Sequence, residues 1–329
     1  KAPRVGVGLS SAMQSVAGED GKLLWVGSIG TGTIDEGKKA RYRQVLWQNH
    51  GYVPVYLSDE ETDAYYTGFS NTSLWPTLHG MTPYAKYSSA WADAYRRVNG
   101  FFADAIMQAI SEDDDPCEQY IVWIHDYHLF LLPHMLRERA EDTSIELKIA
   151  FFLHAPFPAY EVICSHPNCA ELMRGVLAAD LVGFHTYSYV CHFRSTVTRL
   201  FGFGTEGGME HVDVNGRRTA LGVFPIGVNR TAIESTMRSS EFQQFLKNYA
   251  FEGQALVLSV ARLDYSKGIP QQLAAIRRFL EITREACKAG GEKRYDFDPK
   301  VLKRVPVFSG ITKLFAKSRS LSWNPRNTV

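Results

Sequence analysis

Two cations in a glycine-containing loop are the residues of this sequence whose types and spacing most clearly suggest a chemical role. Arg262 and Lys267 lie in the segment ARLDYSKGIP, which follows the apolar run Leu256–Val260. A buried strand, then this loop, then a helix opened by Pro270 is typical of an anion site, because a helix N-terminus offers free N–H groups. Arg262 can offer a planar fork to a phosphate, and Lys267 a point charge. The alternative is an ordinary loop with two solvated charges.

Polar side chains follow three predicted strands at the points where those strands end. His125, Asp126 and His128 follow the first strand, His154 the second and His185 the third. Ligands of open parallel sheets bind beyond the carboxyl ends of the strands, so we predict that these side chains share one rim. Imidazole and carboxylate groups on a rigid rim suit the hydroxyls of a sugar. A metal site is the alternative, but no third ligand has a characteristic spacing, and we predict no metal.

Two further segments could contact a ligand. Gly8 belongs to the small-residue stretch Gly6–Ser11, whose backbone amides could approach a phosphate, although a simple glycine turn explains it equally well. Tyr66 and Trp75 lie in the aromatic segment YYTGFSNTSLWP. Core packing is the default for such rings, yet aromatic rings at a cleft edge also bind sugar phosphates.

The elements that must position these residues alternate from residue 120 onward. Short apolar runs predict strands at 120–124, 149–153, 181–184 and 219–224. Helical patterns lie between them at 129–139, 170–178 and 189–200. This alternation predicts an α/β fold with a parallel, doubly wound sheet.

Local signals complete the predicted layout. Trp91, Tyr95, Val98 and Phe102 recur at helical spacing, which predicts a helix with one aromatic face on the sheet. Asn-Gly at 215–216 predicts a hairpin turn.

The chain is predicted to divide into three regions. The segment Pro225–Gly227 resembles the exit from a first domain. We therefore predict a first α/β domain at 1–227 and the start of a second α/β unit at 228–283. A basic tail without a predicted structure follows at 284–329.

Composition excludes several classes of protein. The 329 residues are 45% apolar and carry a net charge of +1, so we predict neither a nucleic-acid nor a membrane partner. The five scattered cysteines indicate reduced thiols and a cytoplasmic location. Cys164, His166 and Cys169 could hold a metal, but no second cysteine pair matches them. No cofactor is predicted.

Seven ordered segments between Gly6 and Leu280 carry a family resemblance. They are YYTGFSNTSLWPTLH, VNGFFADAI, VWIHDYHLFLLPHMLR, FFLHAPFP, DLVGFHTYSY, FPIGV and ARLDYSKGIP. Together they resemble the trehalose-6-phosphate synthases of glycosyltransferase family 20. The resemblance implies two Rossmann-like lobes of the GT-B type: an N-terminal acceptor lobe at 1–227 and the start of a C-terminal nucleotide-sugar lobe at 228–283, which is incomplete in this chain. It also implies transfer of glucose from UDP-glucose to glucose 6-phosphate with retention of configuration, and no metal.

The resemblance assigns a donor side and an acceptor side. Arg262 and Lys267 match the family's pair on the donor diphosphate, and Gly8 matches its glycine loop. His154 matches a histidine on the donor glucose, and Asp126 matches an aspartate that holds acceptor hydroxyls. We predict that Asp126, His154, Arg262 and Lys267 are the catalytic residues.

On the acceptor side, Tyr66 and Trp75 match aromatic residues around the acceptor and its phosphate. The predicted partners are the two substrates, with a homo-oligomer or a complex with trehalose-phosphate phosphatase or synthase subunits as further possibilities. Two alternatives stay open: a non-catalytic regulatory or truncated paralogue, and a glucosylglycerol-phosphate synthase.

Overall fold

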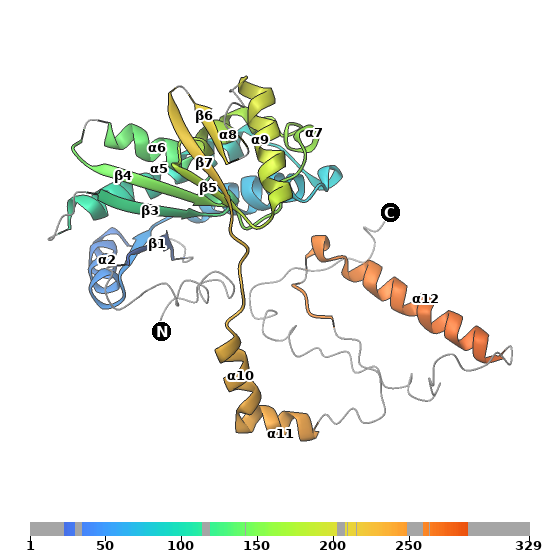
Figure 1. Cartoon of the computed structure of the whole chain (residues 1–329). Coiled ribbons are helices and arrows are strands. Elements are labelled where there is room, and N and C mark those ends of the chain that lie inside the picture. Colours follow the sequence, from blue (N-terminus) through green and yellow to red (C-terminus); the bar gives the residue numbers. More distant parts are fainter. Residues whose placement is uncertain are drawn as a thin grey trace. The chain divides into compact units, whose positions relative to one another are not determined.

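The structure is a computed structural model. It describes residues 23–29, 35–113, 119–141, 143–202, 208, 210–214, 216–248, 259–262 and 264–288. The chain divides into two compact units, residues 1–256 and 257–329 (Figure 1). No helix in the described ranges combines the length and the hydropathy of a membrane span. The predicted loop around Gly8 lies outside these ranges.

A five-stranded sheet forms the centre of the first unit. Its strands, in spatial order, are β3 (Gln119–His125), β4 (Glu146–Phe152), β5 (Leu181–Phe184), β7 (Arg217–Val223) and β6 (His211–Val214). The first four run parallel, and β6 pairs antiparallel with β7. The predicted parallel α/β sheet is therefore confirmed over the four strands β3, β4, β5 and β7.

The turn between β6 and β7 is the predicted hairpin. Gly216 has a φ of +83°, a conformation that a residue without Cβ adopts at no steric cost. Asn215 lies outside the described residues.

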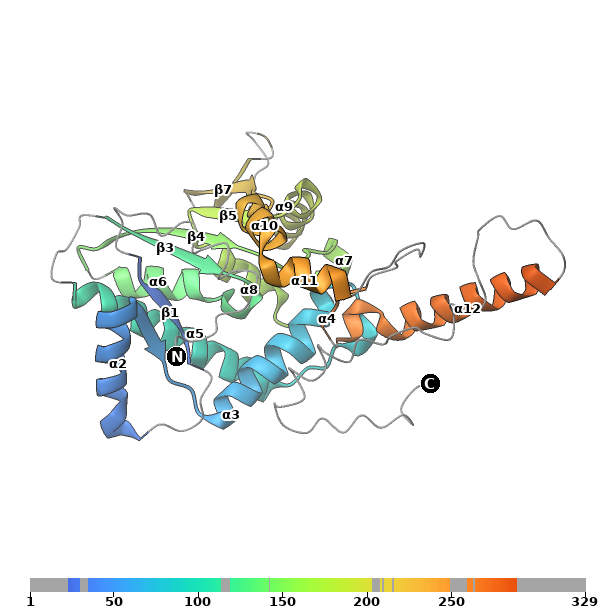
Figure 2. The same cartoon turned by 90° about the horizontal axis from the view of Figure 1, so that it is seen from below.

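Helices follow the strands in the predicted order. These are α6 (Leu132–Ala140) after β3, α7 (Tyr160–Ile163) and α8 (Cys169–Val176) after β4, and α9 (Tyr187–Phe201) after β5. Helix α6 begins three residues later than predicted, because the 3-10 turn η3 (Tyr127–Leu129) precedes it. Figures 1 and 2 both place α6 and α8 together along one side of the sheet.

The predicted aromatic helix is α5 (Ser89–Ser111), which packs against α6. Tyr95 and Val98 are fully buried, Phe102 is nearly so, and Trp91 is partly buried against the core. The helical spacing of these residues therefore marked the buried face of α5 correctly, but the helix packs mainly against residues 63–74 and α6 rather than on the five-stranded sheet.

A π-helix was not predicted. It is η1 (Asp63–Leu74), which follows the short helix α3 (Asp59–Thr62) and leads into α4 (Trp75–Leu78). The side chain of Ser58 accepts a hydrogen bond from the Glu61 N–H at 3.1 Å and so caps the start of α3. π-Helices are rare and usually a single turn, and they occur often at functional sites.

The earlier part of the chain contains elements that were also not predicted. Strands β1 (Trp25–Ser28) and β2 (Tyr52–Val55) form a separate parallel pair joined by helix α2 (Glu36–His50). A 3-10 turn, η2 (Thr82–Tyr84), precedes α5.

Helices α10 (Arg230–Arg238) and α11 (Ser240–Asn248) end the described part of the first unit. The second unit contains the 3-10 turn η4 (Tyr265–Lys267) and helix α12 (Ile269–Lys288). Of the predicted strand at 256–260, residues 259 and 260 have no regular structure, and the rest lies outside the described ranges.

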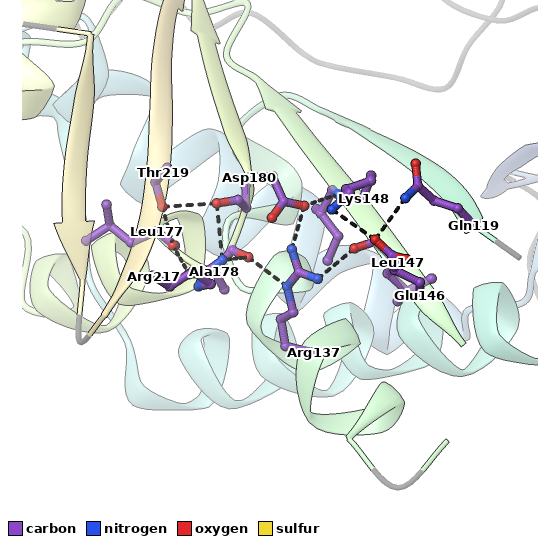
Figure 3. A network of polar contacts seen from close by, with 12 residues as sticks. Gln119, Arg137, Glu146, Leu147, Lys148, Leu177, Ala178, Asp180, Arg217 and Thr219 are labelled. Carbon is purple, nitrogen blue, oxygen red and sulfur yellow. Dashed lines mark hydrogen bonds and ion pairs between the residues drawn. The ribbon is translucent and has the colours of Figure 1, made fainter. Parts of the chain in front are cut away.

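A polar network holds the amino-terminal edge of the five-stranded sheet (Figure 3). Asp180 lies just before β5 and accepts hydrogen bonds from Arg137 Nη2 at 2.6 Å and from the Ile149 N–H of β4 at 2.7 Å. Arg217, the first residue of β7, donates to the carbonyl of Ala178 at 2.6 Å. These contacts tie α6, β4, β5 and β7 together, so the opposite edge can present side chains from a fixed frame.

Candidate functional site

The predicted rim exists at the carboxyl ends of β3, β4 and β5. His125 is the last residue of β3, and Asp126 follows it. His154 lies two residues beyond β4, and His185 comes directly after β5. Because these three strands are adjacent and parallel, their ends bring the four side chains to one edge of the sheet.

Asp126 has an unusual backbone. Its φ of 74° and ψ of 170° lie in a region that residues with a Cβ rarely adopt, and strain of about 1–3 kcal/mol is typical there. The N–H of Asp126 donates to the carbonyl of Phe152 at 2.8 Å, and its Oδ1 accepts from the His154 N–H at 3.2 Å. These two bonds join the ends of β3 and β4 and hold the strained residue in place.

Burial raises the pKa of Asp126 to about 6, although hydrogen bonds from the backbone of Tyr127, His154 and Ala155 act in the opposite direction. The carboxylate is therefore desolvated yet surrounded by donors. Such a group forms strong hydrogen bonds with hydroxyls that enter the site, because little water competes for it.

Three histidines form a row along the rim. His125 Nδ1 lies 3.1 Å from His154 Nε2, and the rings of His154 and His185 have centroids 5.6 Å apart. Burial, and then the neighbouring His154, lowers the pKa of His125 to about 4. Burial, and then His185, lowers the pKa of His154 to about 4. Both rings are consequently neutral at pH 7.

The two aromatic residues predicted for the acceptor side contact the same loop. Tyr66, on η1, stacks its ring on His128 with centroids 5.4 Å apart and an interplanar angle of 9°. Trp75, the first residue of α4, packs its ring against Tyr127 at 5.5 Å. The side chain of Tyr66 is half exposed, whereas Trp75 is partly buried against the core. The structure thus brings Tyr66, Trp75, Asp126 and His154 around the loop that follows β3.

Two residues that support this loop were not predicted. Asn71 of η1 accepts a hydrogen bond from the Tyr127 hydroxyl at 2.8 Å. The buried hydroxyl of Tyr95 in α5 donates to the Tyr127 carbonyl at 2.7 Å. The helical spacing marked Tyr95 as a core residue, but nothing in the sequence indicates the partner of its hydroxyl.

The predicted phosphate cations lie in the second unit. Arg262 is exposed, and its Nη2 lies 3.8 Å from Asp264 Oδ2. Lys267 ends η4, and Gly268 follows it with a φ of +62°. Helix α12 begins at the next residue, so the loop does lead into a helix N-terminus as predicted. The grouping of these cations with His154 and Gly8 stays a prediction.

The possible metal ligands have other partners. The sulfurs of Cys164 and Cys169 lie 3.3 Å apart as free thiols. His166 is buried, with Nε2 at 3.0 Å from the Ser73 hydroxyl and Nδ1 at 3.1 Å from the Asn168 N–H. Among the residues that the structure describes, no group of three or more His, Cys, Asp or Glu side chains is arranged to hold a metal ion.

Known proteins are similar to this chain in both sequence and fold. An Aspergillus fumigatus protein named alpha,alpha-trehalose-phosphate synthase [UDP-forming] 1 is 40% identical over 241 residues, which are 72% of this chain and 45% of that protein. The chain thus spans less than half the length of this curated relative.

Two solved structures are similar to this chain in fold. One is a trehalose-6-phosphate structure from E. coli bound with UDP-2-fluoro glucose, with a TM-score of 0.71 and 27% identity, covering 87% of this chain and 60% of that one. The other is an alpha,alpha-trehalose-phosphate synthase (UDP-forming) from Burkholderia xenovorans in complex with glucose-6-phosphate, with a TM-score of 0.69 and 26% identity, covering 86% and 61%.

These neighbours confirm the predicted GT-B fold class. The sequence profile of glycosyltransferase family 20 matches residues 4–289, which extends the similarity nine residues beyond the predicted limit at Leu280. The chain belongs to glycosyltransferase family 20.

Proposed function

We propose that the protein of this chain transfers glucose from UDP-glucose to glucose 6-phosphate, with retention of configuration, and so forms trehalose 6-phosphate and UDP. The names of its relatives and the ligands of its structural neighbours support this reaction. We place the reaction in the cytoplasm, in keeping with the predicted reduced thiols. A homo-oligomer, or a complex with trehalose-phosphate phosphatase or synthase subunits, is part of the same prediction.

The partly buried carboxylate of Asp126 is the observation that carries this proposal. A strained backbone holds the carboxylate at the rim, beside His154, where it can accept hydrogen bonds from sugar hydroxyls. We assign Asp126 to the acceptor and His154 to the donor glucose. Tyr66 and Trp75, which contact the same loop, are assigned to the acceptor and its phosphate.

In the proposed step, an acceptor hydroxyl attacks the anomeric carbon from the face that UDP leaves. A new C–O bond forms as the bond to the diphosphate breaks, and a donor phosphate oxygen takes the hydroxyl proton. This scheme requires no pair of carboxylates at glycosidase spacing. The protein supplies positioning and charge stabilisation.

Arg262 and Lys267 are assigned to the leaving diphosphate, where two cations stabilise the charge that develops on UDP. Gly8 is assigned to the same diphosphate through its backbone amide. All three assignments rest on matching positions in the family's motifs.

The test is an acceptor comparison. UDP release from UDP-glucose is measured with glucose 6-phosphate and with glycerol 3-phosphate as acceptors. We expect turnover with glucose 6-phosphate, at a rate lowered at least a hundredfold by Asp126→Asn, because the carboxylate then carries no charge. A preference for glycerol 3-phosphate would identify a glucosylglycerol-phosphate synthase.

A non-catalytic, sugar-phosphate-binding subunit predicts a different outcome. Such a protein binds glucose 6-phosphate but releases no UDP with either acceptor. Calorimetry with glucose 6-phosphate alone, run beside the turnover assay, separates this class from an inactive preparation that binds neither substrate.

A further inference from the structure

The contact between His125 and His154 has a direction that the structure determines. The two facing nitrogens, His125 Nδ1 and His154 Nε2, are 3.1 Å apart. Each ring is neutral at pH 7 and carries one N–H, so one nitrogen donates and the other accepts. The other nitrogen of His125, Nε2, is buried and has no hydrogen-bond partner within the described part of the chain.

The buried Nε2 decides between the two arrangements. If His154 donated, the proton of His125 would lie on Nε2 and would be a buried N–H without an acceptor, which is rare in proteins. If His125 donates from Nδ1, its Nε2 is only an unused lone pair. The second arrangement places the single proton of His154 on Nδ1.

The backbone of His154 is held by the residue next to His125. Asp126 Oδ1 accepts from the His154 N–H at 3.2 Å, and the Asp126 N–H donates to Phe152. Consecutive residues at the end of β3 therefore hold both the main chain and the ring of His154. A ring held in this way loses little rotamer entropy when a ligand binds.

We propose that His125 is a positioning residue, which donates from Nδ1 to His154 Nε2 and thereby makes His154 Nδ1–H a hydrogen-bond donor for a hydroxyl oxygen of the donor sugar. This inference rests on the role proposed above for His154. His125 itself acts only through His154.

Nitrogen-15 NMR of the histidine-labelled chain at pH 7 tests the tautomers directly. Two other histidines serve as internal standards, because their partners determine their tautomers. His192 Nδ1 lies 3.0 Å from the Phe157 carbonyl, which can only accept, so its proton is on Nδ1. His166 Nδ1 accepts from the Asn168 N–H, so its proton is on Nε2.

We expect His125 and His154 to match the His192 standard. A His154 proton on Nε2 in the unmodified chain would overturn the proposal. This readout needs no substrate, so it stands apart from the proposed reaction.

Two variants of His125 then test the positioning role. His125→Asn keeps a donor close to the place of Nδ1, whereas His125→Leu keeps the approximate volume and removes the donor. We expect the Nδ1–H signal of His154 to persist in the Asn variant and to give way to a mixture of tautomers in the Leu variant. An unchanged His154 signal in the Leu variant would contradict the role of His125.

Calorimetry tests whether the tautomer of His154 affects the binding of UDP-glucose. We expect His125→Leu to weaken UDP-glucose binding about three- to tenfold, as for one lost hydrogen bond, and to leave UDP binding unchanged, because UDP carries no glucose. His125→Asn should restore most of the loss, and the matched control His192→Asn should change neither affinity. Equal losses for UDP and UDP-glucose would refute the role of His125. If the unmodified chain binds neither ligand, the proposed function fails, and the NMR result alone decides whether His125 positions His154.

Discussion

Asp126 combines two costs that proteins usually avoid, a strained backbone and a desolvated carboxylate. Folding keeps both because the surrounding contacts with Phe152 and His154 over-determine the residue. Strain of this kind clusters at functional sites, where a side chain must be held in a direction that relaxed backbone does not provide. The pKa of Asp126, raised by burial to about 6, makes the electrostatic part of this cost measurable.

Asp126→Asn should reveal the electrostatic cost of Asp126 as a pH-dependent difference in the free energy of unfolding between the native protein and the variant. The folded-state pKa of about 6 exceeds the ordinary value of 3.8, so the folded protein binds more protons than the unfolded chain between these values. The contribution to stability is present below pH 3.8 and is lost as pH rises through 6. We expect the free energy of unfolding of the native protein, minus that of the variant, to fall by about 2–3 kcal/mol from pH 4 to pH 7. Urea titrations at both pH values measure it, and a pH-independent difference would contradict it.

Substitution of Arg262 or Lys267 should affect UDP binding more than substitution of an ordinary surface cation. If they bind the diphosphate, Arg262→Ala and Lys267→Ala each weaken UDP binding by about 1.5–3 kcal/mol, as expected for charge-assisted hydrogen bonds. Arg277 is the matched control, an exposed cation of α12 whose side chain pairs with Glu281 at 3.0 Å. Arg277→Ala should leave UDP affinity unchanged in calorimetry. Equal effects at all three positions would indicate only general electrostatic attraction.

At the scale of elements, the site depends on the packing of η1 against α5. Gly68, within η1, permits that close approach, because a Cβ added there would lie 2.7 Å from the Trp91 ring. Tyr66 and Asn71, which contact the loop after β3, belong to the same π-helix. Displacing η1 from α5 would therefore disturb that loop as well as the core.

Two glycine substitutions should have opposite effects. Gly68→Ala should destabilise the protein by about 1–3 kcal/mol, because the new methyl group overpacks against Trp91. Gly100 lies in the middle of α5, where the nearest atom to an added Cβ, Arg139 Nη2, is 3.5 Å away. Gly100→Ala should stabilise the protein by about 0.5–1 kcal/mol through helix propensity. Thermal unfolding of both variants measures this, and destabilisation of similar size at Gly100 would show that the contact with Trp91 is not the cause.

The pattern of the sequence predicted the elements that have a simple period. Short apolar runs located β3, β4 and β5 to within three residues, because strands of a parallel sheet are rich in such runs, even β3, which lies at the edge of the sheet. The π-helix η1 follows neither the period of a strand nor that of an α-helix, so its segment was seen only as an aromatic cluster. The predicted rim was correct because parallel topology alone places consecutive strand ends at one edge.

At the scale of the molecule, four partly or fully buried histidines are neutral at pH 7. Burial is the first cause that lowers the pKa of each to about 4; they are His125, His128, His154 and His166. Details such as which nitrogen of His125 meets His154 depend on side-chain rotamers and on buried surroundings. No spacing in the sequence encodes them, so they could not be predicted.

These histidines should make the protein sensitive to acid. Their folded-state pKa values lie below the ordinary 6.5, so the unfolded chain binds more protons between pH 6.5 and pH 4, and stability falls as pH decreases through that range. The contribution of Asp126 to stability changes with pH in the opposite direction, but Asp126 is one group against four histidines. We expect a lower melting temperature at pH 5 than at pH 7.

His166→Gln isolates one of these contributions. His166 is buried and its ring contacts the Ser73 hydroxyl and the Asn168 N–H, so urea titrations of the variant measure the contribution of this one histidine to stability. The variant should lose less stability between pH 6 and pH 5 than the native protein, by up to about 1.4 kcal/mol. An unchanged pH dependence would mean that His166 does not contribute to acid sensitivity.

The network of Figure 3 has a consequence for engineering. Its labelled residues lie on α6, at the starts of strands and in the segment between α8 and β5, so the frame of the sheet is secured at one edge and the candidate chemistry lies at the other. Substitutions in the loops after β3, β4 and β5 therefore leave the bonds of this network in place. The edge that carries Arg137, Asp180 and Arg217 is the part that a redesign should leave untouched.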